Sequence, residues 1–299
     1  MVFFSKLGQL GRLGNQLFQY AALRGLSIKN SYNISIPSNV SNFHGQEYLL
    51  KNFSIPEKFF SKKSFIKTFF LKKYTEKSTI EIDKNFFDIP DSTDLQGYFQ
   101  SMFYFYHCID IIKKELKPKF FFIDNAEKKL KKIKNKNKGY KIVSLHMRRG
   151  DIVDKSISYK INNDGLLNLY GFNKFDKKSF YGNYLEKSKN KFKGQKVKFL
   201  IFSGGSQLED KNVTDLDWCK KNFKGDEYLF IEPQESFADF CMIMLCDHNI
   251  ISPVSSFGWW AAFLKQKKGG ITIAPHIYDP TLPNIAHRHM FYPKNWILV

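Results

Sequence analysis

Apolar runs and helix-like patterns alternate through the second half of the chain. Short apolar runs of the kind that form buried strands stand near 140–146, 197–202, 228–231, 249–252 and 271–274. Between them, apolar residues recur at helical spacing near 179–190, 210–223, 236–247 and 256–265. Strands and helices in alternation predict a parallel sheet covered by helices on both faces. We therefore expect an α/β fold.

The first half begins on the same plan and ends in a basic stretch. Val2 to Leu7 predicts a short strand, and the apolar positions between Leu17 and Leu26 have helical spacing. A Lys-rich, helix-like stretch from Glu127 to Lys138 is followed by Gly139, which suits a linker or an exposed helix end. This pattern predicts two domains, an N-terminal one over 1–138 and a C-terminal one over 139–299.

Residues 55–71 alternate Phe and Ile with Lys and Ser. The pattern favours a helix packed by its phenylalanines, with the lysines outside. A membrane or glycolipid surface is the alternative use of such a segment.

Charge and cysteine content narrow the class of protein. The 47 basic and 28 acidic residues give a formal net charge of +19, which favours phosphate-bearing ligands, polyanions or anionic membrane surfaces. Solvated lysines explain part of this excess equally well. The four cysteines are too few for a disulfide framework, so we expect reduced, mostly buried thiols.

The chain shows neither a signal-peptide core near Met1 nor an uncharged apolar stretch of about 18 residues. We expect a cytoplasmic protein, with at most a peripheral contact at the inner membrane face.

A first cluster of candidate residues follows the first predicted strand. Gly8, Gly11 and Gly14 precede Asn15 and Gln16 at the start of a helix. Glycines let the backbone approach a ligand closely, and the first amides of a helix donate to anions. An ordinary turn accounts for the same glycines.

A second cluster is Ser-Leu-His-Met-Arg-Arg-Gly-Asp at 144–151, directly after an apolar run. Ligands gather at the carboxyl ends of parallel strands, so His146, Arg148 and Arg149 are candidates for binding a phosphate. Arginine offers a fixed fork of donors and stays charged, so it can neutralise a leaving diphosphate without a metal. The structural alternative is a pair of salt bridges to Asp151 and Asp154.

A third cluster combines Asp239, in a predicted helix, with Ser255 and Ser256 at the start of the next one. Serines there donate to phosphate oxygens or simply cap the helix. Trp259 and Trp260 are expected to pack in the core. Since no Asp-x-Asp stands in a strand-end loop and the seven histidines lack ligand spacing, we expect no metal.

Three segments together resemble the bacterial-type α1,2-fucosyltransferases, glycosyltransferase family 11, and more distantly the α1,6- and protein O-fucosyltransferases. Residues 11–21 are similar to that family's Gly-Asn-Gln-Phe-Gln-Tyr-Ala signature, and 146–151 to its His-x-Arg-Arg-Gly-Asp motif. Residues 255–262 are similar to its Ser-Ser-Phe-Ser-Trp-Trp-x-Ala motif. Where the family usually has Phe-Ser-Asp-Asp and Asn-Ser-Ser, this chain has Phe-Ser-Gly-Gly at 202–205 and Val-Ser-Ser at 254–256.

The resemblance implies a GT-B-like architecture of two facing Rossmann-like domains, with the nucleotide held mainly by the C-terminal one. It also implies metal-independent, inverting transfer of L-fucose from GDP-fucose, with no cofactor beyond this co-substrate. The acceptor implied is a galactose-terminated oligosaccharide or glycolipid, and the product Fucα1,2Gal.

Carried over residue by residue, the resemblance implies that Arg148 binds the β-phosphate and that His146 lies beside the phosphate or ribose. Asp239 would accept from guanine, and Ser255 or Ser256 would donate to the phosphates. From the N-terminal domain, Gly14 and Asn15 would close over the diphosphate and fucose. The expected donor-binding residues are Gly11, Gly14, Asn15, Gln16, His146, Arg148, Arg149, Asp239, Ser255 and Ser256.

The general base is left open among Asp151, Asp154 and Glu47, with Asp151 nearest the motif. A dissociative route with Asn15 positioning the donor needs no strong base.

Two other interpretations remain. One is a transferase that uses another GDP-sugar or makes another fucose linkage. The other is a basic protein that binds nucleic acid or an anionic surface, although the lysines are scattered and no nucleic-acid-binding signature is present. We expect no nucleic-acid partner, and the oligomeric state is open.

Overall fold

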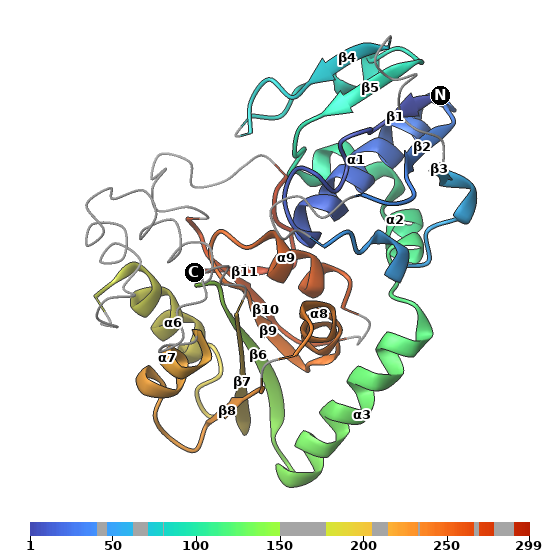
Figure 1. Cartoon of the computed structure of the whole chain (residues 1–299). Coiled ribbons are helices and arrows are strands. Elements are labelled where there is room, and N and C mark those ends of the chain that lie inside the picture. The colour runs from blue at the N-terminus through green and yellow to red at the C-terminus, as the bar shows by residue number, and fades with distance from the viewer. Residues whose placement is uncertain are drawn as a thin grey trace. The chain divides into compact units, whose positions relative to one another are not determined.

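A computed structural model describes residues 1–40, 47–61, 71–79, 81–149, 178–204, 215–232, 234–265, 269–277 and 290–299. The chain divides into two compact units, each considered by itself (Figure 1). Unit 1 is Met1–Phe120 with His287–Pro293, and unit 2 is Phe121–Ala286 with Lys294–Val299. The expected boundary after Lys138 therefore falls inside unit 2, because the Lys-rich helix belongs almost wholly to that unit.

Unit 1 is built on a parallel sheet. In its described part the strand order is β3-β2-β1-β5-β4, and each neighbouring pair is parallel. The strands are β1 (Val2–Phe3), β2 (Ile34–Pro37), β3 (Phe60–Ser61), β4 (Lys72–Thr75) and β5 (Thr93–Gln96). The helices are α1 (Leu13–Asn30) and α2 (Ile109–Glu115), with short 3₁₀ turns at Leu50–Asn52, Glu57–Phe59, Phe86–Asp88, Met102–Tyr104 and Tyr106–Cys108.

The expected helix over 55–71 is wrong in its described part. Phe60 and Ser61 pair with β2 as the edge strand β3, and Glu57–Phe59 form only a 3₁₀ turn. Phe59 and Phe60 are adjacent, so the pattern of this segment does not distinguish a strand from a helix, and its conformation depends on the pairing with β2. Residues 62–70 lie outside the described part of the chain.

Unit 2 carries the second parallel sheet. Among the described residues its order is β11-β10-β9-β6-β7-β8, with every neighbouring pair parallel. The strands are β6 (Lys141–Met147), β7 (Val197–Ser203), β8 (Tyr228–Phe230), β9 (His248–Ile250), β10 (Thr272–Ala274) and β11 (Ile297–Leu298). The helices are α3 (Phe120–Lys136), α6 (Phe180–Asn190), α7 (Asp215–Asn222), α8 (Ser236–Leu245) and α9 (Ser256–Phe263). Every strand and helix predicted for this half is present, which confirms the α/β fold class.

The alternation along β6 assigns its side chains to two cores. Val143, Leu145 and Met147 pack on one face with the aromatic residues of α6 and with Trp218 of α7. On the other face, the buried Asn249 side chain donates to the Ser144 hydroxyl and to the Ile243 carbonyl of α8. Trp259 and Trp260 of α9 are fully buried, so their predicted core role is confirmed.

The described residues also bear on two sequence expectations. All four cysteines are free and buried, as predicted. Within the described part of the chain, no helix is both long and apolar enough to span a membrane.

Candidate active site

Arg148 stands just beyond the carboxyl end of β6, in the centre of the unit 2 sheet. Its backbone N–H donates to the Ser252 hydroxyl at 2.9 Å, and its Nη1 donates to the Val254 carbonyl at 2.7 Å. Both partners lie in the turn between β9 and α9. The guanidinium is thus held at the strand end, where ligands of open parallel sheets bind, and it is only partly buried.

Tyr181 of α6 fixes the same stretch of backbone from the other side of the sheet. Its hydroxyl donates to the Arg148 carbonyl at 3.3 Å and is hydrogen-bonded to the Ser252 hydroxyl. Tyr181 is fully buried. Sequence reasoning missed Tyr181 and Ser252, because the only local signal was an aromatic residue in an amphipathic helix.

His146 lies on β6 two residues before Arg148 and so on the same face. Its Nδ1 is 3.3 Å from the Ser255 hydroxyl, and its ring lies against Phe257. Burial, aided by the positive charge of Arg148, lowers the pKa of His146 to about 3, so the imidazole is neutral at physiological pH. A Cβ at Gly258 would lie 2.8 Å from Nδ1, so only glycine permits this close approach of α9 to β6.

The serines at the start of α9 act as part of the helix terminus. Ser255 is the N-cap, and its hydroxyl accepts from the Gly258 N–H at 3.1 Å. Ser255 is fully buried and Ser256 is 7 % exposed. The capping interpretation is therefore confirmed for Ser255, and the terminus lies beside His146.

Arg149 faces the opposite side of the sheet from Arg148. Its Nε pairs with Asp215 at 3.2 Å, its guanidinium stacks over the Trp218 ring at 4.1 Å, and the residue is only 6 % exposed. Burial lowers the pKa of Arg149, and the nearby Asp215 carboxylate opposes that shift. These are the contacts of a structural arginine. The partner is Asp215 rather than the expected Asp151 or Asp154, both of which lie outside the described residues.

Asp239 lies in the first turn of α8 and is connected to α3. The Gln234 amide donates to its Oδ1 at 2.6 Å, and Lys129 donates to the other end of the same amide. Burial raises the pKa of Asp239 to about 6. Carboxyls whose pKa is raised by burial are typical of functional sites. Gln234, which sequence reasoning missed, sets the orientation of this carboxyl.

In unit 1 the glycine loop leads into α1, whose N-cap is Arg12. No side-chain hydrogen bond caps this 18-residue helix, and its first turn holds no acidic residue that would repel an anion. Gly11 has φ +85°, and a Cβ there would lie 2.1 Å from Asn15 Nδ2. Asn15 is partly exposed and accepts from the Gln100 amide at 2.6 Å. Gly14 is buried in the first turn.

Gln16, also expected on the donor side, is fully buried and turned to the interior. Its Nε2 donates to the Glu47 carbonyl at 2.7 Å, and its Oε1 accepts from the Leu49 N–H at 3.2 Å. Gln19, fully buried as well, donates to the carbonyls of Leu10 and Gly97. Both amides therefore fix loops, whereas the Glu47 side chain is exposed.

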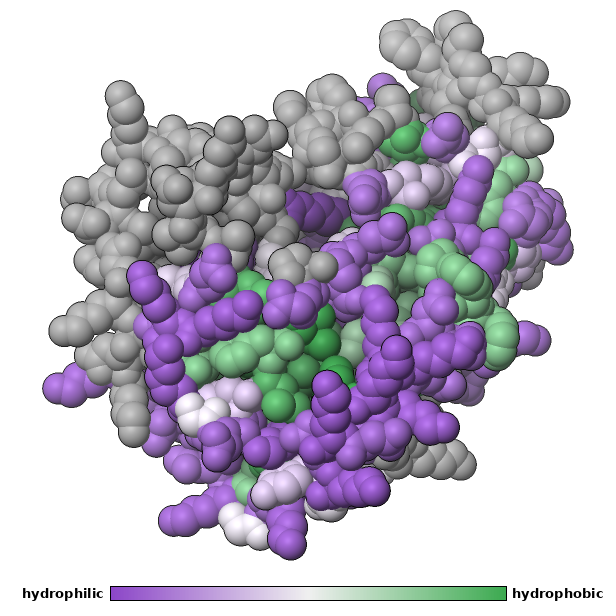
Figure 2. All heavy atoms as spheres, turned by 60° about the horizontal axis from the view of Figure 1, so that its bottom comes forward, coloured by the Kyte–Doolittle hydropathy of each residue, from purple (hydrophilic) through white to green (hydrophobic). Residues whose placement is uncertain are grey.

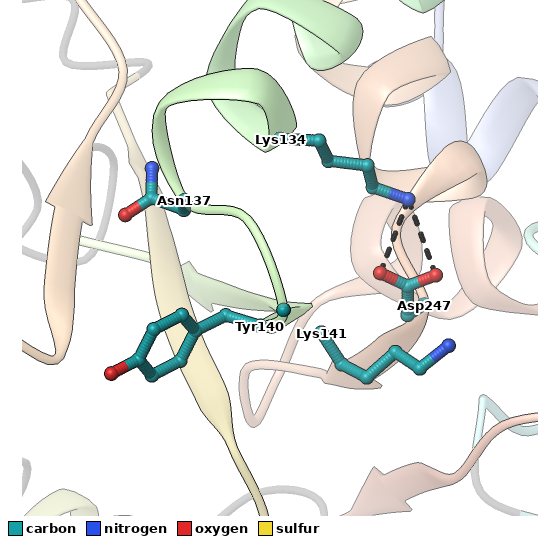
Figure 3. A pocket seen from close by; sticks show the side chains of 6 residues that line it. Lys134, Asn137, Tyr140, Lys141 and Asp247 are labelled. Atoms are coloured by element: carbon teal, nitrogen blue, oxygen red, sulfur yellow. Dashed lines mark hydrogen bonds and ion pairs between the residues drawn. The ribbon is translucent and has the colours of Figure 1, made fainter.

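A pocket of about 300 Å³ opens at the amino end of β6, opposite Arg148 (Figure 3). Lys134 and Asp247 pair across it at 3.1 Å, and the Ile142 N–H donates to the same carboxylate at 2.9 Å. This pocket lies away from the strand ends that carry the motifs. Among all the described residues, no group of three or more His, Cys, Asp or Glu side chains is arranged to hold a metal. The metal-independence expected from the sequence stays a prediction.

An arginine fixed at the carboxyl end of a central parallel strand, beside a helix N-terminus, is an arrangement for binding phosphate groups. Residues 6–299 match glycosyl transferase family 11, and the chain belongs to this family. It is therefore a glycosyltransferase.

The relatives it resembles are distant but extend over most of the chain. It is 26 % identical over 287 residues to the Escherichia coli alpha-1,2-colitosyltransferase, covering 89 % of each chain. It is 25 % identical to the Rattus norvegicus galactoside alpha-(1,2)-fucosyltransferase 2, covering 96 % of this chain and 73 % of that one. A crystal structure of the fucosyltransferase NodZ from Bradyrhizobium aligns with a TM-score of 0.49 and 12 % identity, over 87 % of this chain and 91 % of that one.

Proposed function

We propose that this protein transfers L-fucose from GDP-β-L-fucose to the 2-hydroxyl of a terminal galactoside, forming Fucα1,2Gal with inversion. The observation that carries the proposal is Arg148, fixed between the Ser252 hydroxyl and the Val254 carbonyl at the strand end. Membership of family 11 and two relatives named for α1,2 transfer support the reaction and the linkage.

Each unit, taken by itself, carries residues that we assign to donor binding. In unit 2, Arg148 and the α9 terminus bind the diphosphate, and Asp239 accepts hydrogen bonds from guanine. The neutral His146 accepts or donates one hydrogen bond beside the phosphate without adding charge. In unit 1, the uncapped start of α1 and Asn15 bind the donor, while Gln16 acts only by holding the loop at 47–49.

The chemical step is a displacement at the anomeric carbon. The acceptor hydroxyl attacks from the face opposite the diphosphate, the bond to the β-phosphate oxygen breaks, and GDP leaves with the electron pair. Arg148 neutralises the charge that develops on that oxygen. Removing one such preorganised donor typically costs about 2.7–4 kcal/mol. The acceptor's proton passes to a carboxylate among Asp151, Asp154 and Glu47, or, in a dissociative transition state, passes late to water.

A different donor sugar is the second candidate, and one relative favours it. The Escherichia coli relative is a colitosyltransferase. Colitose is fucose without the 3-hydroxyl, so a site for it needs one acceptor fewer. Gly204, an exposed glycine at the end of β7, stands where the resemblance leads us to expect an aspartate. The missing carboxylate removes one acceptor for a sugar hydroxyl.

Two measurements test the proposal: the turnover of Arg148 variants and the preference of the enzyme between two donor sugars. Arg148→Ala should reduce kcat at least about a hundredfold, with the thermal unfolding transition nearly unchanged, and Arg148→Lys should recover part of the rate. Turnover by Arg148→Ala at nearly the normal rate would remove the assignment.

Comparing kcat/KM for GDP-fucose and GDP-colitose on galactoside acceptors, with product linkage read by NMR, separates the two donors. EDTA should leave the rate unchanged. A loss that Mn²⁺ restores would contradict metal independence.

A further inference from the structure

The outer face of α3 carries exposed phenylalanines at its start. Phe120 is 82 % exposed and Phe121 is 67 % exposed, the highest values among the large hydrophobic side chains that the structure describes. The other face of α3 packs normally, since Ile123, Ala126 and Leu130 are buried. The two phenylalanines are therefore not needed to anchor the helix.

Lysines continue the line that Phe121 begins. At about 100° per residue, positions seven and eleven residues further along a helix lie over the same stripe. Lys128 and Lys132 thus follow Phe121 along the outward face of α3. Lys128 pairs with Asp124 at 2.6 Å, while Lys132 is exposed. One stripe accordingly runs from an apolar end to a basic end.

The surroundings of this stripe are basic as well. Lys131, Lys136 and Lys138 are exposed on or just after α3, and Lys117 and Lys119 are exposed just before it. The face of the molecule in Figure 2 is densely covered by hydrophilic residues, with a smaller apolar area among them. Within α3 six lysines stand against two acidic residues, so the helix attracts anions.

We propose that the outer face of α3 docks on an anionic lipid bilayer. Phe120 and Phe121 enter the interfacial region, and the exposed lysines lie among the head groups, namely Lys128, Lys131, Lys132, Lys136 and Lys138. An amphipathic element binds a membrane through buried apolar area together with attraction to anionic lipid. The charge complementarity selects a lipid surface, since a protein partner would need an acidic groove for the phenylalanines. This inference does not depend on which sugar is transferred.

Binding to vesicles tests the two halves of the stripe separately. The full chain should sediment with phosphatidylcholine vesicles that contain phosphatidylglycerol and stay in solution with phosphatidylcholine alone. Replacing Lys131, Lys132 and Lys136 by Gln should weaken binding about fivefold for each lysine. The matched control replaces Lys191, Lys193 and Lys196, which are equally exposed after α6, and should bind as the wild type does.

The phenylalanines distinguish docking from nonspecific charge attraction. Phe120→Ser with Phe121→Ser should weaken vesicle binding about tenfold or more and leave binding to a soluble polyanion such as RNA unchanged. Ile111→Ser, at an exposed position of α2, is the apolar control. A separate variant, Phe121→Trp, adds a tryptophan whose fluorescence is isolated by subtracting the wild-type spectrum. This difference emission should shift to the blue when anionic vesicles are added.

Equal loss of binding in the two lysine sets, or no effect of the Ser replacements, would overturn the proposal in favour of general polyanion binding. An unshifted difference emission from the Phe121→Trp variant, on vesicles that bind the chain, would overturn it too. Because all these positions are exposed, unfolding is not expected, and circular dichroism checks each variant.

Discussion

Val254 adopts a backbone conformation that its side chain disfavours. Its φ is +53°, and among the non-glycine residues described with positive φ it is the only one branched at Cβ. The carbonyl of this residue accepts the hydrogen bond from Arg148 Nη1, so the strained turn orients the arginine. Asparagine tolerates the left-handed region because its short side chain bonds locally, and the resemblance places Asn at this position. We therefore expect Val254→Asn to stabilise the protein.

Relief of backbone strain and loss of packing act in opposite directions on the stability of the Val254→Asn variant. The left-handed conformation costs about 1–2 kcal/mol for a residue with a Cβ, and asparagine avoids most of that cost. Val254 is only partly buried against the apolar cluster of unit 2, so replacing it loses roughly 0.5–1 kcal/mol of packing. The net gain is about 0.5–1 kcal/mol. For a unit of this size, each kcal/mol moves Tm by about 2–4 °C, so the expected rise is about 1–4 °C.

Calorimetry of the wild type, Val254→Asn and Val254→Thr measures this effect. Threonine keeps the branch at Cβ and the strain, and loses a similar apolar contact, so the comparison of Asn with Thr cancels the packing term. Val254→Asn should melt about 2–6 °C above Val254→Thr, with kcat within about twofold of wild type, because the Val254 carbonyl is backbone. If the Asn variant melts no higher than the Thr variant, the proposed backbone strain at Val254 is refuted.

Three further predictions concern charge. Arg149→Ala should destabilise the protein by about 3–5 kcal/mol because it removes the guanidinium that pairs with the buried Asp215 carboxylate, and adding Asp215→Leu should recover much of the lost Tm. His146 has a folded pKa of about 3 against an ordinary 6.5, so only the unfolded chain takes up its proton between these values and stability falls as pH falls through that window. His146→Asn should make the acid-side decline of Tm shallower; an unchanged slope would contradict the lowered pKa. Asp239 has its pKa raised to about 6, so KM for the GDP-sugar should rise as pH falls through 6, and Asp239→Asn should remove that dependence.

The elements of unit 2 could be predicted from the sequence because their signals are local. Apolar runs separated by helical spacing encode β6 to β10 directly, and Trp259 and Trp260 stand in a helix too apolar to lie on a surface. Unit 1 was harder to predict. Its strand β3 has two residues, and no sequence window that short distinguishes an edge strand from a helix end. Its pairing with β2 determines that this segment is a strand.

Partners far apart in sequence could not be predicted. The ion pair of Arg149 joins residues 66 positions apart, and the hydrogen bond between Tyr181 and Ser252 spans 71 positions. The general attraction of two arginines for phosphate is readable from the motif. Which group each arginine meets depends on the connections between strands, and these bring α7 under one face of the sheet and the turn after β9 over the other.

One difference between the two arginines was nevertheless accessible from the sequence. Side chains alternate between the two faces of a strand, and the alternation of β6 continues past its end. Met147 packs in the core with α6 and α7, and Arg149, two residues on, meets Trp218 of that same face. Arg148 follows His146 to the face of α9. In a motif with adjacent arginines at a strand end, the arginine on the same face as the last buried strand residue is therefore the structural one. The other arginine, here Arg148, is the one that we propose binds the donor.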